Sequence, residues 1–267
     1  MIWDTHIHSH FSSDSTTAPE AQIESAIQKN LPGICFTDHC DLDYPLDPTK
    51  FQLDFDSYFA TLKSLSEKYA SQIEVCIGVE MGLQPHLCSE IHSILNQYPF
   101  DFCIGSSHIV NHREPSLPSF YKGRSQHSAY RSYFESILEN LTVFSDFDVY
   151  GHLDYVVRYG PDKDLGFSYS AYADILDEIL KQLIQKGKGI EVNTGGYRCG
   201  LLRTNPGKDV LTRYKELGGE LITIGSDGHT PDKIALEFER IPLLLKSCGF
   251  SYYCVYKNRR PIYLKLP

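Results

Sequence analysis

A pair of histidines near the N-terminus carries the clearest chemical signal in the chain. His6 and His8 come at the end of the first segment with strand character, Ile2–His6. Residues i and i+2 of a β-strand project from the same face, so both imidazoles can reach one metal ion. A single pair of this kind is weak evidence, because closely spaced histidines also occur by chance.

Nearly every later segment with strand character also ends in a residue that can bind a metal. The expected strands are Ile2–His6, Gly33–Asp38, Ile73–Glu80, Asp101–Ser107, Phe147–Leu153, Gly189–Thr194 and Leu221–Ser226. In a parallel α/β barrel the active site lies at the carboxyl ends of the strands. These ends and the loops after them supply nine candidate ligands: His6, His8, Asp14, His39, Glu80, His108, His152, Asp227 and His229.

Nine candidates are more than one ion needs. A tetrahedral zinc takes about four ligands, and a catalytic zinc leaves one position open for water. The surplus implies two or three ions, with one carboxylate bridging. A histidine taken at random is more often a core or surface residue than a ligand, and we interpret His86, His92, His112 and His127 in that way. Chance does not explain six histidines at matching strand ends.

Longer helical patterns alternate with the strands. The expected helices are Pro19–Gln28, Phe55–Ser71, Ser89–Gln97, His127–Leu141, Tyr169–Lys186 and Lys208–Leu217. This alternation indicates βα units and a parallel sheet. Seven strands are visible, one short of the common eight-stranded barrel, and the tail Phe250–Leu266 is expected to add a final strand or a cap. We expect a single domain over residues 1–267.

Composition limits the partners and the compartment. The net charge of −9 argues against binding of a nucleic-acid polymer, which needs clustered Lys and Arg. No apolar run is long enough for a transmembrane helix, and no signal peptide is evident, so we expect a cytoplasmic protein without a membrane partner. The eight cysteines form no CxxC pair, and Cys35, Cys76 and Cys103 lie in apolar strand segments, which favours reduced, buried thiols.

The strand-end motifs together resemble those of the polymerase and histidinol phosphatase (PHP) family, and in particular its stand-alone histidinol-phosphate phosphatases. The order and spacing of the motifs are specific for the superfamily and less specific for the substrate, and the match covers nearly the whole chain. The motifs are DxHxH at Asp4–His8, TDH at Thr37–His39, GxE at Gly78–Glu80, SxH at Ser106–His108, GHxD at Gly151–Asp154 and SDxH at Ser226–His229.

The resemblance implies a distorted (β/α)7 TIM-like barrel with a trinuclear metal site at the carboxyl ends of the strands. Three groups of side chains would each hold one divalent ion: His6, His8, Glu80 and Asp227; the bridging Glu80 with His108 and His152; and His39 and His229 with Asp14. Many relatives carry His where this chain has Asp14, and a carboxylate there favours harder ions. Zn, Fe and Mn all suit such ligands, so the metals stay open.

The chemistry expected at such a site is hydrolysis of a phosphomonoester. Binding between two divalent cations lowers the pKa of water from about 16 to about 7, and the resulting hydroxide can attack phosphorus in line. Glu80 is expected to act as the bridge, and Asp227 and His229 are positional candidates for the leaving-group acid, although both are also candidate ligands. Glu191 and Asn193 are expected to support the ligands without binding metal.

Four further residues are candidates for substrate binding. Arg158 and Arg198 follow the fifth and sixth strands on the active-site side, and a bidentate guanidinium suits phosphate. Asp43 and Glu114 could provide carboxylates for a cationic end of the substrate. All four are also compatible with ordinary solvated loop positions.

The resemblance implies that L-histidinol phosphate is hydrolysed to L-histidinol and phosphate, a step of histidine biosynthesis. One alternative is a PHP phosphoesterase acting on a nucleotide, such as a nucleoside 3′,5′-bisphosphate. Another is a metal-binding module without catalysis, against which the intact ligand set argues. The expected partner is a small-molecule phosphomonoester, and the sequence leaves the oligomeric state open.

Overall fold

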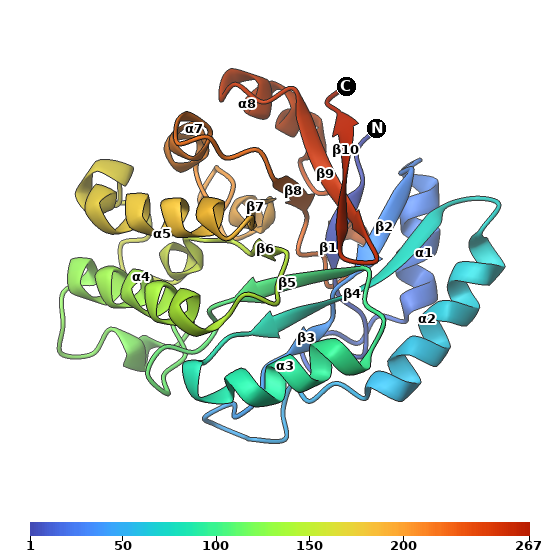
Figure 1. The fold of residues 1–267 in the computed structure, drawn as a ribbon, viewed down its shortest axis with the longest axis horizontal. Coiled ribbons are helices and arrows are strands. Elements are labelled where there is room, and N and C mark those ends of the chain that lie inside the picture. The colour runs from blue at the N-terminus through green and yellow to red at the C-terminus, as the bar shows by residue number, and fades with distance from the viewer.

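The computed structural model describes residues 1–267, and its centre is a parallel β-sheet surrounded by helices (Figure 1). Neighbouring strands along the sheet are all parallel. Their order is β1 (Asp4–Ile7), β2 (Gly33–Phe36), β4 (Glu74–Gly82), β5 (Phe102–Ser106), β6 (Val149–Tyr150), β7 (Gly189–Asn193) and β8 (Ile222–Gly225). All of the expected strands are present, most of them shorter than predicted.

The first and last strands of this order meet and close the sheet. Ile7 forms a parallel bridge with Gly228, and the His8 amide donates to the Gly228 carbonyl at 2.9 Å. The Asp227 amide donates to the His6 carbonyl at 2.8 Å. Closure is irregular, since β6 has only two residues and the register shifts within β1. The predicted distorted (β/α)7 barrel is confirmed.

Helices cover the outside of the sheet (Figure 1). They are α1 (Pro19–Gln28), α2 (Phe55–Tyr69), α3 (Cys88–Gln97), α4 (Gln126–Val143), α5 (Ala173–Gln185), α6 (Gly195–Arg198), α7 (Lys208–Glu216) and α8 (Ile241–Ser247). Local signals fix several starts: Pro19 opens α1, and the Ser125 side chain caps α4 by accepting from the Ser128 amide. No helix combines the length and the apolar character needed to cross a bilayer.

Several elements differ from the expectation. The short strand β3 (His39–Cys40), paired with β4, was not predicted, nor were α6 and α8. The predicted helix Tyr169–Lys186 begins as a 3-10 turn and becomes α-helical only at Ala173. The 3-10 segments are η1 (Pro85–Leu87), η2 (Pro118–Phe120), η3 (Tyr155–Arg158), η4 (Tyr169–Tyr172), η5 (Pro231–Lys233) and η6 (Phe238–Arg240).

The C-terminal tail forms an antiparallel hairpin of β9 (Tyr252–Lys257) and β10 (Arg260–Lys265), next to the N-terminus in Figure 1. The Tyr253 hydroxyl accepts from the Trp3 amide at 3.3 Å, which ties the two ends of the chain together. The expected final strand is thus a two-stranded cap.

The core lies within the sheet and between sheet and helices. Every residue of β2, β5, β7 and β8 is buried, as expected for parallel strands covered on both faces. Cys35, Cys76 and Cys103 lie in this core as free thiols, in agreement with the sequence-based interpretation.

Candidate metal centre

The predicted ligands converge at the carboxyl ends of the strands, around one cavity of about 410 Å³. Six of them line it: Asp14, His39, His108, His152, Asp227 and His229. The other three, His6, His8 and Glu80, are fully buried. Residues far apart in the sequence therefore meet because they lie at, or just after, the carboxyl ends of several strands of one barrel.

Glu80 lies at the middle of this group, on β4. Its Oε1 is 2.7 Å from His152 Nε2 and 3.2 Å from His108 Nε2. Its Oε2 is 3.2 Å from His6 Nε2 and 3.5 Å from His8 Nε2. One carboxylate thus faces imidazoles on both sides, the arrangement expected of a bridging ligand.

In the first two predicted ligand groups, the ligand atoms lie close enough together to bind one ion each. The ligand atoms of His6, His8 and Glu80 lie within 4.8 Å of one another, and so do those of Glu80, His108 and His152. Asp227 lies beside the first group, with Oδ1 3.6 Å from His8 Nε2.

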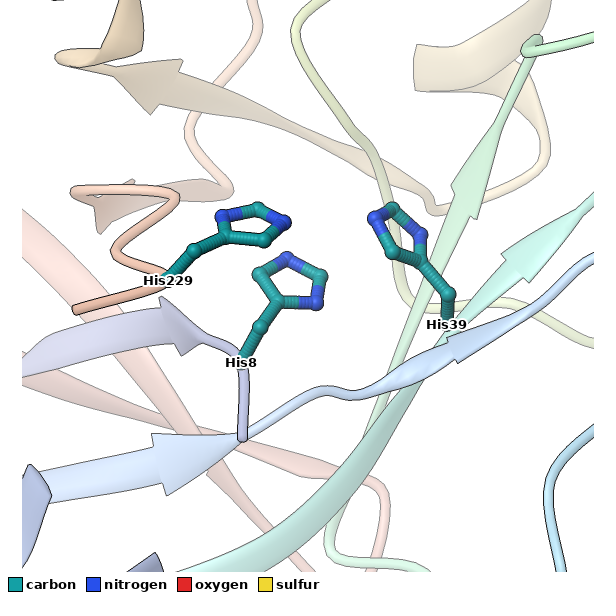
Figure 2. Close-up of side chains that lie close together, drawn as sticks. All are labelled: His8, His39 and His229. Atoms are coloured by element: carbon teal, nitrogen blue, oxygen red, sulfur yellow. The ribbon is translucent and has the colours of Figure 1, made fainter. Parts of the chain in front are cut away.

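The third predicted group, Asp14, His39 and His229, also comes together. Asp14 Oδ2 is 3.2 Å from His229 Nε2 and 3.6 Å from His39 Nε2. Figure 2 shows the three imidazoles His8, His39 and His229 grouped together, with the His8 ring below the His229 ring. The centroid of the His8 ring is 4.1 Å from that of His229 and 4.2 Å from that of His39. Close packing of His8, His39 and His229 joins the third group to the first.

The hydrogen bonds of His6 and His8 test whether a cation fits here. His6 Nδ1 donates to Glu191 Oε1 at 2.6 Å. His8 Nδ1 donates to Ser12 Oγ at 3.1 Å, because that hydroxyl donates its own hydrogen to Asp38. When neutral, each ring therefore keeps its Nε2 lone pair, and the two Nε2 atoms face each other at 3.0 Å. Two lone pairs at this distance need a proton or a cation between them.

Buried atoms without partners support the same conclusion. Glu80 Oε2, His39 Nδ1 and His152 Nδ1 are buried and form no hydrogen bond. Glu80 Oε2 and His39 Nδ1 are only 3.0 Å apart, but their geometry is not that of a hydrogen bond. Buried polar atoms are normally satisfied, so the donor set fits divalent cations.

Electrostatics keep the carboxylates ionised. Burial raises the pKa of Glu80, but the imidazoles of His6, His108, His39 and His152 together hold it well below its usual range. Burial likewise raises the pKa of Asp14, and His39 and His229 lower it to about 2. For Asp227, Arg158 and Arg198 outweigh burial and keep the pKa well below normal.

The surroundings shift the pKa values of His6 and His8 in opposite directions. Burial lowers the pKa of His6, but Glu191 and Glu80 raise it well above its usual value. Burial and three neighbouring imidazoles hold the pKa of His8 well below normal. Without metal, one proton is thus favoured on His6 and disfavoured on His8, as their facing Nε2 atoms require.

Supporting residues hold the ligands in place. Glu191 accepts from His6 and from the His152 amide, and Asn193 donates to Glu191 at 3.0 Å, as the sequence predicted for this pair. The sequence placed Asp41 in an acidic stretch that could contact a cationic substrate group, and it did not predict that Asp41 accepts from His108 Nδ1 at 2.7 Å. Asp41 lies two residues after the candidate ligand His39, and this short spacing was the sequence signal that could have placed it near the metal centre.

The two candidate phosphate arginines differ in their surroundings. Arg158 has a side chain only 2% exposed and donates to Asn205, Asp227 and Asn193 at 2.7–2.9 Å. Arg198 is 28% exposed and donates through Nη1 to the Asp227 carbonyl at 2.6 Å. Both line the cavity, and Arg198 has more guanidinium surface free.

The two candidate carboxylates for a cationic substrate group are also placed differently. Glu114 lines the cavity and accepts a hydrogen bond from Tyr44. Asp43 does not line it, and its carboxylate pairs with His86 at 2.9 Å. Lys233, which the sequence interpretation did not single out, adds a third cationic side chain to the lining.

The PHP domain family matches residues 4–195, which include seven of the nine predicted ligands. The chain belongs to the PHP domain family. The PHP domain prediction from the strand-end motifs is confirmed.

Relatives of this PHP domain protein match it over nearly its full length. It is 35% identical over 263 residues to a histidinol-phosphatase of Lactococcus lactis, covering 96% of this chain and 95% of that protein. It is 35% identical over 251 residues to a probable histidinol-phosphatase of Clostridium acetobutylicum, covering 94% and 95%.

A solved structure shows the same fold. The crystal structure of histidinol phosphate phosphatase from Lactococcus lactis, complexed with Zn, L-histidinol and phosphate, matches with a TM-score of 0.91. The two are 33% identical, and the match covers 98% of each chain. The putative histidinol phosphatase of Listeria monocytogenes, at 20% identity and a TM-score of 0.76, shares the fold.

Proposed function

We propose that this protein is a histidinol-phosphatase, which hydrolyses L-histidinol phosphate to L-histidinol and inorganic phosphate in histidine biosynthesis. The observation that carries the proposal is the meeting of nine metal-capable side chains around one cavity. The Lactococcus lactis structure, which holds Zn, L-histidinol and phosphate, supports the choice of substrate.

The proposed metal centre holds three divalent ions, with zinc, iron and manganese as candidates. His6, His8, Glu80 and Asp227 would hold one; Glu80, His108 and His152 the second; and Asp14, His39 and His229 the third. When bound, such ions supply a hydroxide near neutral pH and neutralise charge on the phosphoryl oxygens.

The other cavity residues bind and orient the substrate. Arg198 offers free guanidinium N–H groups to the phosphate, while Arg158 holds the Asp227 carboxylate at 2.7 Å through a buried ion pair. Glu114 faces the same cavity and can accept from the ammonium or imidazole of the substrate. Asp43, which pairs with His86, would reach a substrate only if the loop that carries it moved.

We also propose that residues 1–267 act as one PHP domain in the cytoplasm, on a small-molecule substrate and without a nucleic-acid polymer. The ligands come from both ends of the chain, His6 from β1 and His229 from the loop after β8, so a divided chain would separate them.

Phosphate release tests the proposal. The metal-free protein is loaded with Zn, Fe(II) or Mn(II) and offered L-histidinol phosphate or a nucleoside 3′,5′-bisphosphate. We expect metal-dependent turnover with a kcat/KM for L-histidinol phosphate at least about a hundredfold higher, since a site with buried polar partners rejects a mismatched substrate strongly. A higher value for the nucleotide would favour that alternative, and metal binding without any release would favour a non-catalytic module.

A further inference from the structure

We propose that Asp41 is a positioning residue that orients His39 and His108, so that two of the three proposed metal sites depend on one carboxylate outside the ligand set. The inference rests on the metal centre described under Proposed function and does not depend on the identity of the substrate. Nothing in the strand-end motifs includes Asp41.

The contacts of Asp41 reach two ligands at once. Oδ1 accepts from His108 Nδ1 at 2.7 Å, and Oδ2 lies 3.5 Å from His39 Nδ1. One carboxylate oxygen of Asp41 and one ring nitrogen each of His39 and His108 lie within 4.8 Å of one another. The side chain of Asp41 lines the cavity but is only 5% exposed, so most of its surface contacts protein.

The hydrogen bond to His108 decides which nitrogen is free. A carboxylate can only accept, so His108 Nδ1 carries a hydrogen, and Nε2, which lies 3.2 Å from Glu80 Oε1, is the nitrogen left to bind a cation. His39 Nδ1 is buried without a hydrogen bond, and Asp41 is one of the two carboxylates that face it. An anionic acceptor behind a ligating imidazole fixes its tautomer and strengthens it as a ligand.

The fold makes room for this carboxylate at Gly82, the last residue of β4. A Cβ on Gly82 would lie 2.0 Å from Asp41 Oδ1 and 2.7 Å from its Cγ, so any side chain there displaces the Asp41 carboxylate. The same strand carries Glu80 two residues earlier. Strand β4 therefore supplies both the proposed bridging ligand and the space for the residue that orients its partners.

Asp41 also begins the loop that lines the cavity. Its amide donates to the Phe51 carbonyl at 3.1 Å, and the Phe51 ring lies edge-on to His39 at 5.4 Å. Tyr44 of the same loop also lines the cavity and donates to Glu114. A shift of Asp41 would therefore move the cavity wall together with the two imidazoles.

Metal binding by the full-length protein tests the proposal directly. Zinc affinity is measured by competition with a chelator, and Co(II) substitution gives an absorption spectrum that reports ligand geometry. Loss of a supporting acceptor typically costs 10- to 100-fold in metal affinity, so we expect Asp41→Asn to weaken zinc binding by about that factor and to alter the Co(II) spectrum. Asp47→Asn removes the same charge from an exposed position in the same loop and should behave like the parent.

Gly82→Ala provides the second test, because it leaves every titratable group in place. It should weaken zinc binding like Asp41→Asn. In an Asp41→Ala background, Gly82→Ala should cost no further affinity, since the displaced group is already gone. A full additional loss in that background would show that Gly82 acts independently of Asp41 and would count against the proposal.

Parent-like zinc affinity and Co(II) spectra in both Asp41→Asn and Asp41→Glu would overturn the proposal that Asp41 positions His39 and His108. A parent protein that releases no phosphate from L-histidinol phosphate would end the proposed function alone. The role of Asp41 would still stand if Asp41→Asn lost zinc affinity in that protein. If Asp41→Asn does not fold, Asp41→Glu, which keeps the charge but moves it by one methylene, decides the outcome by the same zinc and Co(II) measurements.

Discussion

At the scale of single residues, Glu80 is the proposed ligand whose loss should affect the metal centre most. It is fully buried, ionised and surrounded by imidazoles on both sides. We expect Glu80→Gln to lose most bound metal and to lower kcat/KM by more than about a hundredfold, because a neutral amide cannot replace a carboxylate shared by two cations. Atomic emission spectroscopy and phosphate release measure the two effects.

Glu74→Gln is the matched control for Glu80→Gln. Glu74 begins the same strand but is exposed, so this change should keep the metal content and turnover of the parent. Parent-like metal content and turnover in Glu80→Gln would remove Glu80 from the metal centre.

Alanine variants of Arg158 and Arg198 should distinguish a loss of substrate binding from a loss of bound metal. Arg198→Ala should lower kcat/KM about ten- to a hundredfold with metal content intact, since a charge-assisted hydrogen bond contributes roughly 1.5–3 kcal/mol. Arg158→Ala should in addition lower the metal content, because it leaves the buried Asp227 carboxylate without its 2.7 Å partner. Steady-state kinetics and metal analysis of both variants check this split. If both keep parent kinetics, the phosphate is bound without arginine.

Asp14 is the most exposed of the nine predicted ligands, with a side chain 39% exposed. Asp14→Ala should lower the occupancy of one proposed ion in three and leave the ions bound by Glu80 largely in place. Activity should fall, because phosphate loses one of its cationic contacts. Metal stoichiometry measures the first effect. Loss of all ions at once, or of none, would be inconsistent with a separate third site.

At the scale of elements, the barrel depends on close packing where β1 and β2 begin. A Cβ on Gly33 would lie 2.5 Å from three ring atoms of Trp3, which is only 6% exposed. We expect Gly33→Ala to lower the free energy of unfolding by about 1–3 kcal/mol, the usual cost of overpacking. Urea unfolding measures it.

A double variant identifies the cause. In a Trp3→Leu background the ring is absent, so Gly33→Ala should cost much less there than in the parent. An equal cost in both backgrounds would mean that backbone conformation at residue 33, and not the Trp3 ring, requires glycine.

At the scale of the whole molecule, the metal ligands join distant parts of the chain. His6 lies on β1, Glu80 on β4 and Asp227 in the loop after β8, so bound ions should stabilise barrel closure. Free zinc at a hundredfold excess over Kd would add about 2.7 kcal/mol per site. We expect removal of metal to lower Tm by about 5–10 °C per site, and zinc to restore it. Thermal unfolding with and without a chelator checks this, and an unchanged Tm would contradict it.

Metal binding should also release protons. Burial lowers the pKa of His39, but Glu80 and Asp14 raise it to about 9 in the metal-free protein. At pH 7–8 this imidazole is protonated and must lose its proton to bind a cation, so zinc affinity should rise with pH up to about 9. Calorimetry in buffers of different ionisation enthalpy measures the released protons. Equal apparent enthalpy in all buffers would exclude such release.

The sequence by itself determined the pattern of elements and the set of candidate ligands. Pro19–Gln28 was predicted with its observed ends, since Pro in the first turn and the apolar spacing are local signals. The ligands were found because parallel strands bring their carboxyl ends together whatever the details of packing. Such information is carried by periodicity, by motif order and by residue type.

Only the tertiary structure decided how those residues are supported. The β3 strand at His39–Cys40 forms because β4 lies beside it, and two residues carry no periodicity of their own. Asp41 supports His108 because Gly82 of the neighbouring strand leaves room for its carboxylate. Arg158 is buried against Asp227, 69 residues away in the sequence. Contacts of this kind depend on distances between side chains of separate strands, which no local pattern encodes.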